Sequence, residues 1–300
     1  MDGVEKGREV LAVGESGVFG RWWQVEYIEF WDGGCLVEWV MESVGLYTDA
    51  SVYDILHGPG TAEDVDALEA IAAKHAAGAP DVWLEPACGS GRYLRVAAGR
   101  AAERQVIGFD YESGMVEYAQ RRAEGAGVAD RSSFFVGDMR DFGAHVEKNS
   151  VGFAFNMINT FRHLETDVDA LRHFEEIARV LAPGGVYVVG ISLTVYGLEP
   201  PSEDVWEGAR GRCRVSQVVQ YMPPTDPDGD RMEQVYSHLT IERPRGEEHR
   251  PSHYALRAYD LDQWRTLIGR GALREVAVVD QEGETCKATA QGYSLWVLGR

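Results

Sequence analysis

A glycine-containing loop between a short apolar strand and a helix constrains the fold of this chain more than any other stretch. The segment runs from Val82 to Leu94 and reads VWLEPACGSGRYL. Gly89 and Gly91 permit a backbone turn that a Cβ would block, and they let a ligand contact the main chain. A helix that begins there directs unpaired N–H groups at whatever occupies the loop. The stretch therefore predicts a nucleotide-type site at the carboxyl end of a parallel strand in an open α/β sheet.

The residues around the two glycines discriminate between nucleotide ligands. A dinucleotide site takes a third glycine where this chain has Leu94. Glu85 stands four residues before the first glycine, and its carboxylate would repel a pyrophosphate but suits a ligand that carries an ammonium group. An ordinary glycine-rich turn is the alternative interpretation. The choice between a nucleotide site and an ordinary turn therefore depends on whether later segments of the chain supply the other binding residues at suitable distances.

Two further predicted strands also end in a carboxylate. The second apolar strand ends at Asp110, nineteen residues after Gly91. This is close to the spacing at which a βαβ unit presents an acid to ribose hydroxyls, although a plain helix N-cap is an alternative. The third strand ends at Asp138 and Met139. Because parallel strands end at the same edge of a sheet, these acids are expected to surround one site with Glu85.

The pattern acidic-x-x-x-Gly-x-Gly, followed by two strand-end acids, resembles that of the class I S-adenosylmethionine (SAM) dependent methyltransferases. The resemblance implies that Asp138 accepts from the adenine amino group and that Met139 supplies the adjacent N–H. It also implies an α/β fold with a seven-stranded, doubly wound Rossmann-like sheet whose last strand is antiparallel. The cofactor-binding residues expected on this basis are Glu85, Ala87, Gly89, Gly91, Asp110, Tyr111, Met115, Asp138, Met139 and Asn156.

Three residues are candidates for the catalytic side of the site. Asn159 and His163 lie in the segment after the fourth strand, which faces the transferable methyl in the resembled family. His163 is a candidate base or polar contact, with a structural cap or a surface histidine as the alternative. Tyr53 belongs to a Tyr–Asp pair that precedes the first core helix, and by resemblance it closes over the cofactor. Tyr47 is a second candidate for that position.

The substrate class is limited by a missing motif and by charge. No Asn/Asp-Pro-Pro-aromatic tetrad follows the fourth strand, which argues against methylation of an adenine or glutamine amide and favours a small-molecule acceptor. The net charge of −19 makes nucleic acid an unsuitable partner. A protein or RNA methyltransferase, or a non-catalytic SAM-binding subunit, is the alternative.

The predicted organisation has four parts. An aromatic-rich stretch followed by Asp32-Gly33-Gly34 predicts a β-hairpin, although residues 36–44 could equally be helical. This extension is expected to form a lid or a homodimer interface. The expected parts are an N-terminal extension (1–60), the SAM-binding core (61–192), a three-stranded antiparallel insertion over the substrate side (193–259) and the completion of the core sheet (260–300).

Cellular location and metal content are predicted from what the sequence lacks. No signal peptide or apolar run of membrane-spanning length is present, so a cytoplasmic protein without membrane contact is expected. The four cysteines lie far apart and show no metal-type spacing, and no metal is expected.

Overall fold

The computed structural model describes residues 27–31, 34–38 and 46–300, and the chain divides into two units, residues 1–43 and 44–300. In the first unit, strands β1 (Tyr27–Trp31) and β2 (Gly34–Glu38) pair antiparallel, with Trp31 opposite Gly34. This confirms the predicted hairpin and makes residues 36–38 strand rather than helix. The remainder of the predicted extension up to residue 45 lies outside the described residues, so its role as lid or interface stays a prediction.

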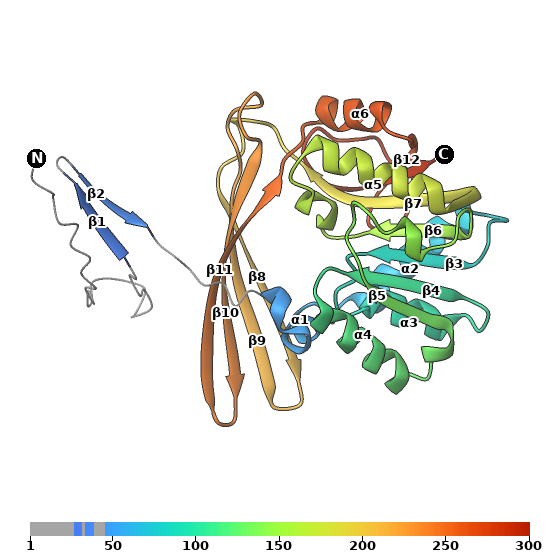
Figure 1. Cartoon of the computed structure of the whole chain (residues 1–300), viewed down its shortest axis with the longest axis horizontal. Helices are drawn as coiled ribbons and strands as arrows, with labels where there is room; N and C mark the ends of the chain where they lie inside the picture. The colour runs from blue at the N-terminus through green and yellow to red at the C-terminus, as the bar shows by residue number, and fades with distance from the viewer. Residues whose placement is uncertain (1–26, 32–33, 39–45) are drawn as a thin grey trace, which may run out of the picture. The chain divides into compact units, whose positions relative to one another are not determined.

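A seven-stranded sheet forms the centre of the second unit (Figure 1). Its order is β12-β13-β7-β6-β3-β4-β5; β13 is antiparallel to both neighbours, and the strands from β7 to β5 are parallel. The predicted sheet and its antiparallel last strand are confirmed. The strands are β3 (Val82–Pro86), β4 (Gln105–Asp110), β5 (Ser132–Val136), β6 (Val151–Asn156), β7 (Leu181–Leu193), β12 (Arg274–Val279) and β13 (Gly292–Gly299).

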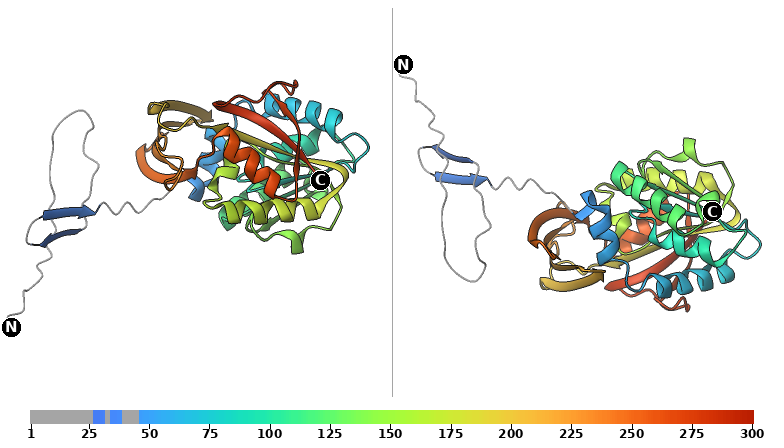
Figure 2. Two further views of the ribbon diagram at one scale, coloured as in Figure 1. Left: turned by 90° about the horizontal axis from the view of Figure 1, so that it is seen from above. Right: turned by 90° about the horizontal axis from the view of Figure 1, so that it is seen from below.

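Helices cover both faces of this sheet, which is the doubly wound arrangement (Figure 2). One buried cluster contains side chains of α5 (Asp167–Val180) and α6 (Leu261–Arg270). The opposite cluster contains side chains of α2 (Thr61–His75), α3 (Arg92–Arg100) and α4 (Ser113–Gly125). In the described part of the chain no helix is long and apolar enough to cross a membrane.

The spacing of apolar residues explains why these segments are amphipathic helices. In α5 the buried side chains of Ala170, Phe174 and Ile177 recur at intervals of four and three residues and therefore lie on one face, with Ala178 four residues after Phe174. Thr166 caps the helix by accepting from the Asp169 N–H at 3.1 Å. The sequence of α5 therefore determines both where the helix begins and which side it buries.

The insertion between β7 and α6 is a separate antiparallel sheet with the order β11-β10-β9-β8. The prediction of three strands is wrong because the insertion has four. The sequence does not reveal β8 because this strand lies at the sheet edge and most of its side chains are exposed, so it lacks an alternating apolar pattern. The strands are β8 (Ser202–Arg210), β9 (Cys213–Met222), β10 (Met232–Arg243) and β11 (Gly246–Arg257).

A short helix connects this insertion to the core. Helix α1 (Ala50–Leu56), preceded by the 3-10 turn Leu46–Thr48, contacts β8 and β9 on one side and α4 on the other (Figure 1). Asp49 caps α1 by accepting from the Val52 N–H at 3.2 Å. Because α1 also carries Tyr53, this predicted site residue lies where the core meets the insertion.

Candidate active site

The glycine loop follows β3 and leads into α3, as predicted. Ala87, Gly89 and Gly91 have φ values of +50°, +53° and +65°. A Cβ on Gly89 would lie 3.0 Å from the Tyr53 ring, whereas a Cβ on Gly91 would meet Ala119 at the same distance. Gly89 is therefore needed where α1 approaches the loop, and Gly91 where α4 packs behind it. Ala87 adopts a left-handed backbone conformation, which costs an L-residue conformational free energy. Strained positions of this kind are frequent at functional sites.

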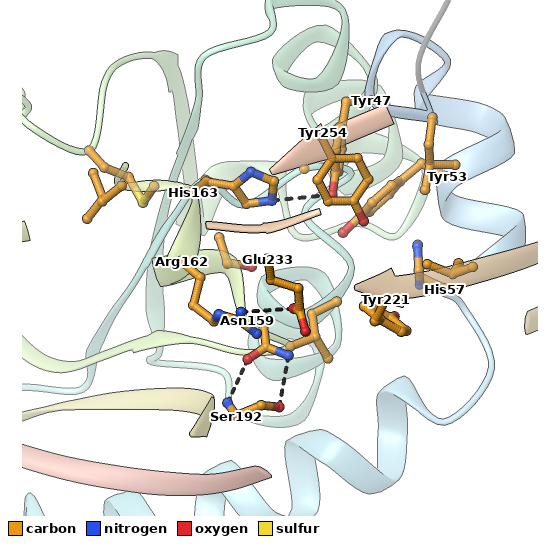
Figure 3. Close-up of a pocket in the computed structure, with 18 of the residues that line it drawn as sticks. Tyr47, Tyr53, His57, Asn159, Arg162, His163, Ser192, Tyr221, Glu233 and Tyr254 are labelled. Carbon is orange, nitrogen blue, oxygen red and sulfur yellow. Dashed lines mark hydrogen bonds and ion pairs between the residues drawn. The ribbon is translucent and has the colours of Figure 1, made fainter. Parts of the chain in front are cut away.

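A cavity of about 1010 Å³ adjoins this loop and extends to the insertion sheet. It is lined by the ends of the parallel strands, by α1, by the segment after β6 and by strands of the insertion (Figure 3). Glu85, Gly91 and Asn156 are predicted site residues that do not line it. The predicted residues that do line it are Tyr53, Ala87, Gly89, Asp110, Tyr111, Met115, Asp138, Met139, Asn159 and His163.

Asp110 joins the first two strand ends. Its carboxylate accepts from the Gly89 N–H at 2.8 Å and from the Glu112 N–H at 3.0 Å. Burial raises the pKa of Asp110, although these backbone donors oppose the shift. The side chain thus fixes the glycine loop against the start of α4 while it faces the cavity. This position, on a strand end beside the loop, leaves the carboxylate facing the cavity, and ribose binding by Asp110 stays a prediction.

Asp138 is bound by a residue that the sequence did not single out. Arg140 Nε lies 2.9 and 3.1 Å from the two carboxylate oxygens, and the Arg140 N–H donates to one of them at 2.8 Å. Hydrogen bonding to Arg140 outweighs burial and lowers the pKa of Asp138. An adenine amino group would have to share this carboxylate with Arg140. The adenine contact of Asp138 stays a prediction.

Glu85 is a buried carboxylate behind the loop. It is only 5% exposed, and its Oε2 atom has no hydrogen-bond partner among the described residues. Burial raises the pKa of Glu85 well above its ordinary value; Arg92 lowers it and Asp110 raises it further. Leaving a buried polar atom unsatisfied costs free energy, so Glu85 is suited to a ligand that brings a donor or a positive charge.

Asn156 has both ends of its amide occupied. Its Nδ2 donates to the Pro86 carbonyl at 2.5 Å, and its Oδ1 accepts from the Tyr187 hydroxyl at 2.5 Å. The side chain is 1% exposed. The geometry therefore gives Asn156 a supporting position behind the glycine loop, and its predicted contact with the cofactor stays a prediction.

Asn159 faces the cavity but uses its side chain to anchor the backbone (Figure 3). Its Nδ2 donates to Ser192 Oγ at 3.1 Å, and its Oδ1 accepts from the Ser192 N–H at 2.7 Å. Asn159 and the preceding Ile158 have φ values of +64° and +47°. A positive φ strains a β-branched residue such as Ile158. The hydrogen bonds from Asn159 to Ser192 of β7 therefore stabilise an unfavourable turn beside the site.

His163 lies against tyrosines at the far end of the cavity. Its Nε2 is 3.4 Å from the Tyr47 hydroxyl, and its ring stacks on Tyr254 with 5.7 Å between centroids. Burial by the surrounding walls, with a contribution from Arg162, lowers the pKa of His163 to about 4. The accessible surface of His163 is that of an exposed residue, so water weakens this effect. Both considerations leave the imidazole neutral at pH 7.

Sequence reasoning missed the residues that the insertion contributes, and it missed Arg162 of the core, which pairs with one of them. Arg162 is 4% exposed; its Nη2 pairs with Glu233 at 2.9 Å and its Nε donates to the Arg257 carbonyl at 2.8 Å. Tyr221 and Tyr254 lie close to the same carboxylate, which raises the pKa of each in addition to burial. No motif marks these positions, because antiparallel strands bring them to the cavity from distant parts of the chain.

The neutral state of His163 gives a testable pH dependence. Because the pKa of His163 is lowered, the imidazole should remain uncharged as the pH falls through the ordinary histidine range near 6.5. We expect the His163 ring signals in ¹H–¹³C NMR spectra to titrate with a midpoint below the ordinary histidine value. The variant His163→Gln identifies the signals by their loss. A midpoint at the ordinary value would show that the cavity walls do not lower the pKa of His163.

Comparison with known protein families supplies the identity of the core. Residues 84–185 match the family model described as a methyltransferase domain. Residues 84–185 therefore carry a methyltransferase domain. The matched residues include the glycine loop and the strand ends of β4 to β6, which are the segments that carry the sequence resemblance. A comparison of the whole chain with proteins of curated function finds no match.

Solved structures share the fold of this chain over most of its length. DesVI of Streptomyces venezuelae has 19% identity and a TM-score of 0.63, covering 82% of this chain and 97% of that one. The sugar N-methyltransferase KedS8 of Streptoalloteichus sp ATCC 53650 has 15% identity and a TM-score of 0.60, with 96% and 98% covered. The SAM-bound amino pentose methyltransferase CalS10 of Micromonospora echinaspora has 18% identity and a TM-score of 0.56, with 78% and 89% covered.

Proposed function

We propose that this chain transfers a methyl group from SAM to a nitrogen atom of a small-molecule acceptor. One observation carries the proposal: a single cavity joins the strand-end residues Asp110 and Asp138 to the insertion residues Tyr221 and Glu233. Two reactants can therefore meet inside one enclosure. Binding both in attack geometry supplies about 7–11 kcal/mol of the barrier reduction in well-oriented reactions.

The residues around the glycine loop fit SAM in charge and in space. The unpartnered Oε2 of Glu85, a buried atom outside the cavity lining, would suit the ammonium group if SAM reached behind the glycine loop, and Asp110 faces the cavity where ribose hydroxyls would lie. Met115 is 2% exposed and Tyr111 is 73% exposed, so the adenine would pack between a buried and an exposed side chain. SAM supplies an electrophilic methyl on a sulfonium. The chain's own residues orient that methyl toward the acceptor and exclude water from it.

Nitrogen is favoured over oxygen as the attacked atom because of the character of His163. A lowered pKa makes its imidazole a weak base, which serves an alcohol poorly. An amine needs only to lose its ammonium proton to water before its lone pair forms the new N–C bond. The C–S bond breaks, sulfur takes its electron pair to give SAH, and the products are a methylated ammonium and a neutral thioether. The aromatic rings of Tyr221 and Tyr254 line this end of the cavity and can contact a cationic amine. The Glu233 carboxylate beside them is already paired with Arg162.

Amino sugars are the first acceptors to test, because two of the structural relatives are described as sugar N-methyltransferase and amino pentose methyltransferase. A homodimer, a cytoplasmic location and a reaction without metal or nucleic acid stay predictions. Within residues 46–300 and the hairpin strands, no group of three or more His, Cys, Asp or Glu side chains gathers as metal ligands do.

Calorimetric titration with SAM, S-adenosylhomocysteine (SAH) and NAD tests the cofactor. We expect SAM and SAH to bind and NAD not to bind, because Leu94 replaces the third glycine of a dinucleotide site. Mass spectrometry of amino sugars incubated with enzyme and SAM then tests transfer, with the matching hydroxyl sugars as controls. Methylation of the hydroxyl compounds alone would contradict the choice of nitrogen, and absent SAM binding would reject the whole proposal.

Replacement of His163 separates binding from transfer. We expect His163→Ala to lower turnover and to leave SAH affinity unchanged, because the ring lies at the acceptor end beside Tyr47 and Tyr254. Initial rates and SAH titration measure the two effects, and His145→Ala, which changes a histidine absent from the cavity lining, is the control. Full turnover in His163→Ala would leave the residue a purely structural role.

A further inference from the structure

A buried carboxylate on α1 has five partners and no role in the chemistry proposed above. Asp54 is fully buried, and it is the residue after Tyr53. Burial raises the pKa of its carboxyl, but Arg95, Arg210 and Ser90 outweigh that effect and hold the pKa below its ordinary value. Asp54 is therefore ionised, and its partners determine what the charge holds together.

One oxygen of this carboxylate holds the glycine loop. Ser90 Oγ, between the two loop glycines, donates to Asp54 Oδ1 at 2.9 Å. Arg95 of α3 donates to the same oxygen at 3.2 Å and to the Ser90 carbonyl at 3.2 Å. Asp54 thus fixes both the side chain and, through Arg95, the backbone of the loop in which SAM is expected to bind. It also fixes α1, which places the Tyr53 ring against Gly89.

The other oxygen holds the insertion and α4. Arg210, at the end of β8, donates to Asp54 Oδ2 at 2.6 Å and to the Asp54 carbonyl at 3.2 Å. Tyr118 donates to Oδ2 at 3.0 Å and accepts from Arg210 at 2.9 Å, and Arg122 Nε lies 3.6 Å away. A single charged group therefore connects the cofactor loop to the first strand of the acceptor-side sheet.

The backbone of β8 lies directly against α1 at the same place. A Cβ on Gly208 would come within 2.1 Å of the Ile55 carbonyl oxygen. Trp206 of the same strand lines the cavity and makes an edge contact with His57, with 5.6 Å between centroids. A shift of α1 would therefore displace β8, and with it a wall of the acceptor half of the cavity.

We propose that Asp54 is a positioning residue that transmits SAM occupancy of the glycine loop to β8, so that the acceptor wall becomes ordered only when the cofactor is bound. The inference rests on the proposed function, because it takes the glycine loop as the SAM site. Its consequence is ordered binding, with SAM before the acceptor.

Hydrogen–deuterium exchange of the full chain with and without SAH tests this inference without an acceptor. In the wild type, SAH should slow exchange in peptides from α1 and from β8. In Arg210→Gln, SAH should still bind and still protect α1, but the protection of β8 should be lost. A merely structural Arg210 would raise exchange of β8 equally with and without SAH.

Two further variants make the result specific. Arg250→Gln removes a different ion pair between the insertion and α1, in which Arg250 Nη1 lies 3.1 Å from Asp49 Oδ2 without reaching the loop; it should keep the SAH-dependent protection of β8. Asp54→Asn leaves the surrounding guanidinium groups uncompensated and should weaken SAH binding by roughly tenfold. The melting temperature of each variant shows whether it is folded.

The possible outcomes separate this inference from the proposed function. Failure of the wild type to bind SAH rejects both. If SAH binds but β8 is protected equally in the wild type and in Arg210→Gln, the SAM site stands and the role of Asp54 is overturned. Loss of protection in Arg250→Gln to the same degree overturns it as well, because the effect would then belong to any contact between α1 and the insertion.

Discussion

Asp110→Ala should weaken SAM and SAH binding by roughly tenfold or more, because a hydrogen bond to a charged group contributes about 1.5–3 kcal/mol. Two losses add in this variant. The carboxylate that faces the cavity is removed, and the Gly89 and Glu112 N–H groups lose the acceptor that joins the loop to α4. Isothermal titration calorimetry with SAH measures the affinity directly.

A surface replacement of the same kind controls for charge. Asp130→Ala removes an equal charge from a side chain that is 79% exposed and distant from the cavity lining, so its SAH affinity should equal that of the wild type. Asp110→Asn keeps an oxygen that can accept from the Gly89 N–H. Its SAH affinity should therefore lie between those of Asp110→Ala and the wild type. Wild-type affinity in Asp110→Ala, with an unchanged melting temperature, would show that Asp110 does not contact the cofactor.

Gly89→Val should abolish measurable SAH binding while the rest of the sheet remains folded. Gly89 has a φ of +53°, which costs a β-branched residue about 1–3 kcal/mol, and a Cβ there would lie 3.0 Å from the Tyr53 ring. The added side chain would displace either α1 or the loop. Either movement removes the N–H groups from the position where a ligand meets them.

Gly114 provides the matched control for this experiment. It lies in the first turn of α4, and a Cβ on it would meet nothing within 4 Å. Gly114→Ala should leave SAH affinity unchanged and stabilise the protein by up to about 1 kcal/mol, because alanine has the higher helix propensity. Thermal unfolding and SAH titration distinguish the two glycines. Retained SAH binding in Gly89→Val would contradict a close approach of ligand to the loop.

The parallel core follows from local features of the sequence. Apolar runs such as β3 and β4 are buried on both faces, and the glycines between β3 and α3 adopt the positive φ that their sequence predicts. Glu85, Asp110 and Asp138 could be placed at one edge because the direction of parallel strands determines where each strand end lies. These predictions need only neighbouring residues and the rule that parallel strands align.

Two features of the fold and site escaped sequence reasoning for physical reasons. The edge strand β8 has few buried side chains, so its sequence shows no alternation. Arg140 lies only two residues from Asp138, yet its pairing depends on a turn that no motif marks. In both cases the stabilising interactions are polar or at a sheet edge, where apolar periodicity carries no information.

By itself, the sequence determined the order of the core elements, the glycine loop and the set of strand-end acids, since each depends on short-range patterns. Only the tertiary structure decided which side chains from distant segments contact these elements. Arg162 meets Glu233 across 71 positions of sequence, and Arg210 meets Asp54 across 156. Such contacts depend on how the insertion packs on α1 and the core, and packing between distant segments leaves no periodic signal in either segment.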